Sequence, residues 1–248
     1  MGEQHLVLTS EGDRMRQAVI LTVVAVLFVG SCGTQGVGEM QRESQVVALK
    51  DARSVGAELS MGAGELNVTG GADALMEADF AYNVADWKPD VSYEVSGSTG
   101  DLSVEQGSGE GVRLGGDARN EWDVRFNDEV PTDLRVEMGA GESDLDLDSL
   151  ALKELDLRIG AGQTTVDVTG DYEQDLDASI QGGVGEANVM LPSEIGVRVR
   201  AQGGLGKINA EGLEREGDLY VNDAYGDSDV TLDVEVQGGV GEINLEVV

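Results

Sequence analysis

The stretch LRVEMGAGESDLDLDSLALKELDLRIGAGQTTVDV (residues 134–168) contains the pattern that decides the fold. Apolar residues alternate in it with charged or polar ones, and Gly-Ala-Gly interrupts the alternation twice. Leu134, Val136 and Met138 form the apolar set before the first interruption. An alternation with a period of two places one set of side chains on each face of a β-strand. The stretch therefore predicts strands that each bury one face.

The tripeptide glycine, small or apolar residue, glycine returns along the whole chain. Its copies are Gly62-Ala63-Gly64, Gly139-Ala140-Gly141, Gly160-Ala161-Gly162, Gly183-Val184-Gly185, Gly204-Leu205-Gly206 and Gly239-Val240-Gly241. The copies that start at 139, 160, 183 and 204 are separated by 21, 23 and 21 residues. A regular return of this kind is typical of repetitive architectures in which each unit stacks on its neighbour.

The predicted fold is all-β, a β-solenoid-like stack of short strands with Gly-x-Gly turns. Two short strands and two turns fit within one repeat, and such a unit needs another layer against its apolar face. Glycine at the bends permits a positive φ and a close approach of neighbouring units. An antiparallel β-sandwich with glycine-rich hairpins stays open as the alternative, because alternation alone does not determine strand order.

The first 31 residues form a predicted lipoprotein signal peptide that contains the signal helix. Arg14 and Arg16 precede the apolar residues 18–29, and Val-Gly-Ser leads to the cysteine of a lipobox. A charged segment, a short apolar segment and small residues before a cleavage site are typical of a secretory signal. We expect cleavage after Ser31 and lipidation of Cys32. The alternative is a secreted protein with an incidental cysteine.

Lipid on Cys32 predicts attachment to a membrane of the bacterial cell envelope without a spanning helix. Gly33 follows the cysteine. An aspartate in that place tends to retain Gram-negative lipoproteins in the inner membrane, so Gly33 favours the outer membrane. Translation can start at Met1 or at Met15.

Composition excludes several classes of function. The only histidine, His5, and the only cysteine, Cys32, lie at or before the predicted cleavage site. The mature chain then lacks the residues of Ser-His and Cys-His nucleophiles and of zinc or haem sites. The formal net charge is −32, which repels nucleic acid. We therefore expect no catalytic residues, no cofactor, no metal site and no nucleic-acid partner.

The rest of the chain divides into three predicted segments. Residues 32–45 are rich in Gly, Gln, Glu and Ser, as a flexible tether would be. Residues 46–130 are β-rich and hold most of the aromatic residues. They would either cap the stack or form a separate small sandwich. Residues 131–248 form the predicted β-solenoid, and the wider gap from 204 to 239 leaves room for one extra strand and a turn.

The later repeats resemble a known family. The residues that carry the resemblance are Gly160-Ala161-Gly162, Asp167-Val168-Thr169-Gly170, Gly182-Gly183-Val184-Gly185, Leu191-Pro192, Gly196-Val197, Gly203-Gly204-Leu205-Gly206, Tyr220-Val221-Asn222, Tyr225-Gly226 and Gly238-Gly239-Val240-Gly241. They are similar to the bacterial "putative adhesin", or toast-rack, group and to the C-terminal region of LiaF-type cell-wall-stress proteins. The match covers residues 134–248 well and residues 46–130 loosely. Because of this match, residues 46–130 are expected to be toast-rack-like.

The resemblance implies a β-solenoid-like envelope protein that is often lipidated and has no defined activity. We therefore expect a non-catalytic, lipid-anchored protein with an adhesin-like surface for an unknown envelope or protein partner. The alternative is an envelope-stress signalling or scaffold role of the LiaF type. A carboxylate-based hydrolase is a remote alternative. With 48 acidic residues, some pairs of carboxylates lie at catalytic distances by chance, so such a pair is weak evidence for catalysis.

Overall fold

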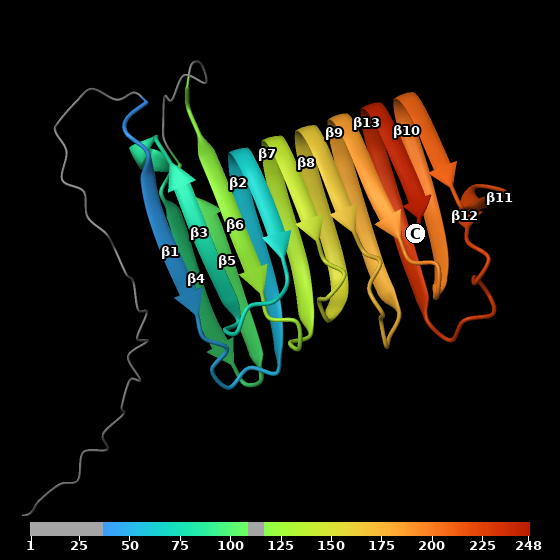
Figure 1. Cartoon of the computed structure of the whole chain (residues 1–248), viewed down its shortest axis with the longest axis horizontal. Coiled ribbons are helices and arrows are strands. Elements are labelled where there is room, and N and C mark those ends of the chain that lie inside the picture. The colour runs from blue at the N-terminus through green and yellow to red at the C-terminus, as the bar shows by residue number, and fades with distance from the viewer. Residues whose placement is uncertain (1–36, 109–116) are drawn as a thin grey trace, which may run out of the picture.

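The computed structural model describes residues 37–108 and 117–248, which form thirteen strands in one continuous sheet and one short 3₁₀ helix (Figure 1). The elements are β1 (Gln41–Val47), β2 (Ser54–Thr69), β3 (Met76–Tyr82), η1 (Ala85–Trp87), β4 (Pro89–Ser96), β5 (Thr99–Gln106), β6 (Asn120–Phe126), β7 (Thr132–Asp146), β8 (Leu152–Asp167), β9 (Leu176–Leu191), β10 (Gly196–Glu211), β11 (Glu214–Glu216), β12 (Leu219–Val221) and β13 (Thr231–Val247).

The strands β2, β7, β8, β9, β10 and β13 are 15 to 17 residues long, and each bends into a U near its middle (Figure 1). We call each bent strand a rung and its two halves the first and second arm. Neighbouring rungs run parallel and in register. Ala140 of β7 pairs with Ala161 of β8, for example, which places Gly139 beside Gly160. Apolar residues of both arms point into the U and form the core.

This architecture confirms the all-β, β-solenoid-like fold class. The units differ from the expected pairs of short strands, because one long strand supplies both arms and the Gly-x-Gly lies inside it. Parallel pairing between rungs also excludes the antiparallel sandwich for this part of the chain.

Glycine is required at two positions of the bends of β7, β8, β9, β10 and β13, because neighbouring backbones nearly touch there. A Cβ atom on Gly160 of β8 would collide with the carbonyl oxygen of Gly139 in the neighbouring rung β7. A Cβ atom on Gly162 would collide with the carbonyl oxygen of Gly141, and Gly162 has a φ of 141°. The middle residue has no such restriction, which explains why it varies between Ala, Val and Leu.

The order of the rungs is β2-β7-β8-β9-β13-β10, so the last strand of the chain lies between β9 and β10. Val240 of β13 pairs with Val184 on one side and with Leu205 on the other. The expectation that every unit stacks on its sequence neighbour is therefore wrong at this point. Two short strands, β11 and β12, occupy the gap after β10, where one was expected, and lead the chain back to β13.

At the N-terminal end, each arm of β2 pairs with its own group of strands. The first arm pairs with β5 and through it with β4, and the second arm pairs with β6, then β3 and β1. Phe80 of β3 and Trp122 of β6 pack edge to face, with ring centroids 5.3 Å apart. One hydrophobic core runs from this region through the rungs.

The sheet starts at Gln41, inside the segment predicted as a tether. Residues 41–47 pair along their whole length with β3, which supplies backbone partners that a tether would lack. The boundary at residue 130 stays a prediction. The signal peptide, Ser31 and Cys32 lie outside the described residues. Within the described parts, no helix is both long and apolar enough to cross a bilayer.

Candidate binding surface

A shallow groove crosses the outer side of the first arms, close to the bends. Its floor consists of glycines that lack side chains and align from rung to rung: Gly62, Gly139, Gly160, Gly183 and Gly239. One wall is the row of outward side chains two residues earlier in each rung: Ser60, Glu137, Arg158, Gln181 and Gln237. We call this feature the glycine groove, and its volume is about 720 Å³.

The wall of the glycine groove is polar and locally neutral, although the chain as a whole is strongly acidic. Arg158 donates from Nη1 to Glu137 Oε1 over 3.0 Å and from Nη2 to Asp156 Oδ2 over 2.8 Å. These contacts hold the guanidinium flat along the wall. The exposed amides of Gln181 and Gln237 follow, and Gln237 Nε2 donates to Glu235 Oε1 over 2.7 Å. The wall therefore offers amide donors and acceptors over the later rungs.

A ridge runs along the bends themselves. It consists of the middle residues of the tripeptides, in spatial order Ala63, Ala140, Ala161, Val184, Val240 and Leu205. We call this row the apex ridge. Val184, Val240 and Leu205 are 57%, 47% and 74% exposed. Apolar side chains with this exposure on adjacent rungs make a solvent-facing apolar stripe, which is a feature of interaction surfaces.

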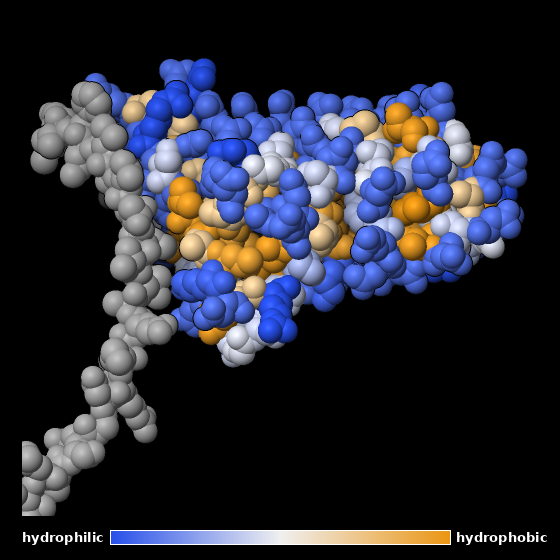
Figure 2. Space-filling view, turned by 60° about the horizontal axis from the view of Figure 1, so that its bottom comes forward, coloured by the Kyte–Doolittle hydropathy of each residue, from blue (hydrophilic) through white to orange (hydrophobic). Residues whose placement is uncertain are grey.

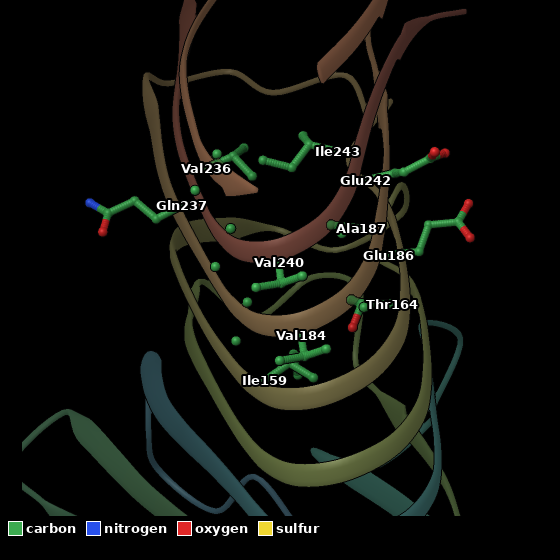
Figure 3. A pocket seen from close by; sticks show the side chains of 18 of the residues that line it. Ile159, Thr164, Val184, Glu186, Ala187, Val236, Gln237, Val240, Glu242 and Ile243 are labelled. Atoms are coloured by element: carbon green, nitrogen blue, oxygen red, sulfur yellow. The ribbon is translucent and has the colours of Figure 1, made fainter. Parts of the chain in front are cut away.

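A small hollow of about 40 Å³ lies at the bends of β8, β9, β10 and β13 (Figure 3). In Figure 3, Val236 and Ile243 point toward one another from the two arms of β13, whereas Gln237 and Glu242 point away. Ligand pockets usually measure several hundred Å³, so this hollow is a packing defect and not a substrate site.

The hollow results from the residues at the inner corners of the bends. On the first arm, the inner corner positions are Met61, Met138 and Ile159 in the first three rungs and Gly182, Gly238 and Gly203 in the last three. In β13, Ile243 of the second arm fills the space beside Gly238. A Cβ atom added to Gly238 would lie 3.1 Å from Cδ1 of Ile243. In β9 the second arm offers only Ala187, so neither arm fills the corner.

A second groove of about 390 Å³ lies on the outer side of the first arms farther from the bends. Its lining includes the acidic residues Glu58, Glu94, Asp101, Asp133, Glu154 and Asp156. Asp156 is buried, and its Oδ2 lies 3.3 Å from Arg135 Nε and 2.8 Å from Arg158 Nη2. Among residues 37–108 and 117–248, no group of three or more His, Cys, Asp or Glu is placed to hold a metal ion.

Among the described residues, one carboxyl group has a shifted pKa. Asp148 is exposed as a residue, but partial desolvation of its carboxyl raises the pKa, and the neighbouring carboxylate of Asp146 raises it further. Burial also raises the pKa of the Tyr172 hydroxyl, with a contribution from Asp167. These groups lie just after β7 and β8, at the loop ends of the rungs. None of them lines either groove or the hollow.

Cys32 is the one functional residue that the sequence predicts, with cleavage at Ser31, and neither residue lies in the described part of the chain. The groove and the ridge are not predicted by the sequence pattern. The change from Met-Gly or Ile-Gly to Gly-Gly before the middle residue, in step with the change from Ala to Val or Leu, is the signal that marks the hollow and the ridge.

Comparisons with known proteins agree with this geometry. The family described as the N-terminal domain of toast_rack, DUF2154, matches residues 36–190. The structure of a "putative cell adhesion protein" from Clostridium sporogenes is 35% identical, covers 85% of this chain and 100% of its own, and superposes with a TM-score of 0.83.

More distant structures also match. A "putative adhesin" from Parabacteroides merdae is 10% identical, with 87% of this chain and 98% of that chain covered and a TM-score of 0.30. One from Bacteroides fragilis is 11% identical, with 86% and 100% covered and a TM-score of 0.29. No curated protein matches the chain.

Proposed function

The chain belongs to the toast_rack family, and from this membership we propose that it is a non-catalytic, adhesin-like protein of the bacterial cell envelope. The observation that carries the proposal is the similarity to the Clostridium sporogenes protein, which extends over the whole of that chain at 35% identity. The position of the shifted carboxyl group of Asp148, outside both described grooves and the hollow, supports a role without acid–base chemistry.

The surface that we assign to the partner is the glycine groove. It is open along its length and crosses at least five rungs at a right angle to the strands. A floor of aligned glycines lets an extended chain approach the backbone, and the amides of Gln181 and Gln237 can bond to it. The groove therefore suits an extended, uncharged polymer of an envelope or a host surface.

Attachment of cells tests this proposal. The full chain is displayed on a non-adherent bacterial host, and bound cells are counted on immobilised glycans and matrix proteins. We expect attachment to rise with the amount displayed. Gln181→Arg, which fills the groove, should abolish the gain. The matched variant Gln163→Arg adds the same charge at an exposed position on the second arm of β8 and should not.

An unchanged count at every level of display, or an equal loss with both arginine variants, would contradict the adhesin-like role of the groove. A changed envelope-stress response on deletion, with normal attachment, would instead favour the signalling role of the LiaF type.

We further propose that lipid on Cys32 anchors the protein, with the outer membrane as its location. The support is the lipobox that ends at this cysteine and the glycine that follows it. Labelled palmitate should enter the wild-type chain and the Ser31→Ala variant, and should be absent from Cys32→Ala. Label retained in Cys32→Ala would show that another residue carries the lipid.

A further inference from the structure

The two ends of the stack of rungs are finished differently. At the N-terminal end, side chains cap the bend of β2. Gln106 Oε1 accepts hydrogen bonds from the amides of Gly62 over 2.9 Å and Ala63 over 3.3 Å. Asn120 Nδ2 donates to the carbonyl oxygen of Ala63 over 3.1 Å. The peptide groups of this terminal bend therefore have partners within the chain.

The opposite end is formed by β10, and its bend is open. One side of β10 pairs with β13 along the strand. On the other side, β12 pairs only with Arg198 and Val199. Within the described residues, the segment from Arg200 to Glu211 thus has no strand on its outer side. An edge of this kind presents unpaired N–H and C=O groups to solvent.

The hydrophobic core also ends without a cover at this bend. Ala201, Ile208 and Ala210 of β10 are only half-buried, although they occupy the same inner positions as the buried Val236, Ile243 and Leu245 of β13. Leu205 is more exposed than Val184 and Val240, the other two large side chains of the apex ridge. Apolar side chains are visible near this end of the molecule, at the right of Figure 2.

We propose that two copies of the chain associate through these open edges, β10 against β10, antiparallel about a twofold axis through the bend. The free segment is self-complementary in charge. When its centre lies on the axis, Arg200 stands opposite Glu211 of the second copy, and the same pair forms a second time across the axis. Within one copy Arg200 Nε already lies 3.7 Å from Oδ2 of the exposed Asp218, so Glu211 would be a second carboxylate beside the guanidinium. Opposite charges at facing positions stabilise such a pairing.

The same register also matches the apolar faces. Ala201 meets Ala210 of the second copy, and Gly203 meets Ile208, so inner positions face inner positions and the two cores become continuous. The alternative, a head-to-tail chain of copies, would have to pair this bend with the capped end of β2. A twofold arrangement closes on itself and leaves no open bend.

The side-chain amides on the outer face provide a further match. Asn188, Asn244 and Asn209 form a ladder across β9, β13 and β10, with amide contacts of 2.7 Å. The ladder stops at Asn209 on the free edge. In the proposed register Asn209 lies opposite Gln202 of the second copy, whose amide can continue the ladder.

The mass of the full chain in solution tests the proposal. The chain is purified in a non-ionic detergent, and its protein mass is measured by light scattering over a range of concentrations and salt. We expect a dimer that tightens as salt rises, because each copy carries a formal charge of −32 and salt screens the repulsion.

A charge exchange then tests the register. Arg200→Glu replaces two attractive contacts in the dimer with repulsive ones and should weaken the dimer about tenfold or more. The double variant Arg200→Glu and Glu211→Arg should restore it. Arg119→Glu, an equal change at the N-terminal end, should leave the dimer intact, and Leu205→Asp should abolish it.

A chain that is monomeric at every concentration and salt would overturn the proposal. A dimer that is unaffected by Arg200→Glu and Leu205→Asp, or a polymer that grows without limit, would overturn it as well. Circular dichroism of each variant separates loss of the dimer from loss of the fold. The outcome is independent of the attachment assay, because the glycine groove lies outside the proposed contact.

Discussion

Gly182 and Ala187 face the same hollow from the two arms of β9, and neither fills it. In the neighbouring rung β8, Ile159 and Thr164 occupy these positions, and in β13 Gly238 and Ile243 do. Each of those rungs has at least one large side chain at the corner. The underfilled corner of β9 makes residue 182 a place where added volume should stabilise the protein.

Gly182→Ala should therefore raise the free energy of unfolding by about 0.5–1 kcal/mol, because it fills space and restricts the unfolded chain. The only atom near the added Cβ would be the Gln237 carbonyl oxygen at 3.9 Å. Thermal or urea denaturation at neutral pH measures the change. A lowered midpoint would show that the corner cannot accept a methyl group.

Gly183→Ala, one residue further along, should have the opposite effect. The added Cβ would collide with the carbonyl oxygen of Gly160 in the neighbouring rung, and backbone cannot move aside as a side chain can. We expect a loss of about 2–4 kcal/mol, in the range of severe single substitutions. The same denaturation series measures it, and equal stabilities of the two variants would refute the close stacking of the bends.

Asn120→Ala should destabilise the N-terminal end of the stack. The buried side chain of Asn120 donates to Ala63 O and to Gln106 Oε1 and accepts from Trp122 Nε1 over 3.0 Å. Its removal leaves the buried indole N–H without a partner. A loss of about 2–3 kcal/mol follows from the cost of unpaired buried polar groups. Tryptophan fluorescence during unfolding reports the change, and Gln163→Ala at an exposed position serves as the control.

Asp148→Asn should stabilise the protein at neutral pH. Partial desolvation and the Asp146 carboxylate raise the pKa of the exposed Asp148 carboxyl in the folded state, so ionisation opposes folding. This group's contribution to stability is fully present below its unfolded pKa and is lost as pH rises through the folded pKa. The gain in the free energy of unfolding from Asp148→Asn should therefore grow as the pH rises from the unfolded pKa through the folded pKa of Asp148, and it should vanish in stronger acid. Melting temperatures of both proteins across that pH range measure it, and a gain that does not depend on pH would contradict this explanation.

The strand pattern of the rungs could be predicted from single residues. The apolar residues of the first arm of β8 point into the protein core and are buried, as their alternation predicts. They are Leu155, Leu157 and Ile159. The glycines were expected at bends, and the carbonyl contacts of Gly160 and Gly162 give the reason for their recurrence. The family resemblance, carried by the same glycines, is confirmed.

The candidate surface could not be predicted in the same way. The glycine groove depends on the alignment of Gly62 with Gly139 and Gly183 across rungs that are distant in sequence. Alternation shows that Ser60 and Gln181 point outward, but only pairing places them in one row. The predicted anchor at Cys32 rests on sequence alone.

The amino-acid sequence by itself determined the all-β class, the inward and outward faces of each arm and the position of every bend, because these depend on local alternation and on glycine. The tertiary structure decided the order of the rungs. All six bends present equivalent glycine backbones, so β13 can stack between β9 and β10 as well as beyond them. Its place follows from long-range pairing, in which β12 returns against the first arm of β10 and leaves the remaining edge of that rung open.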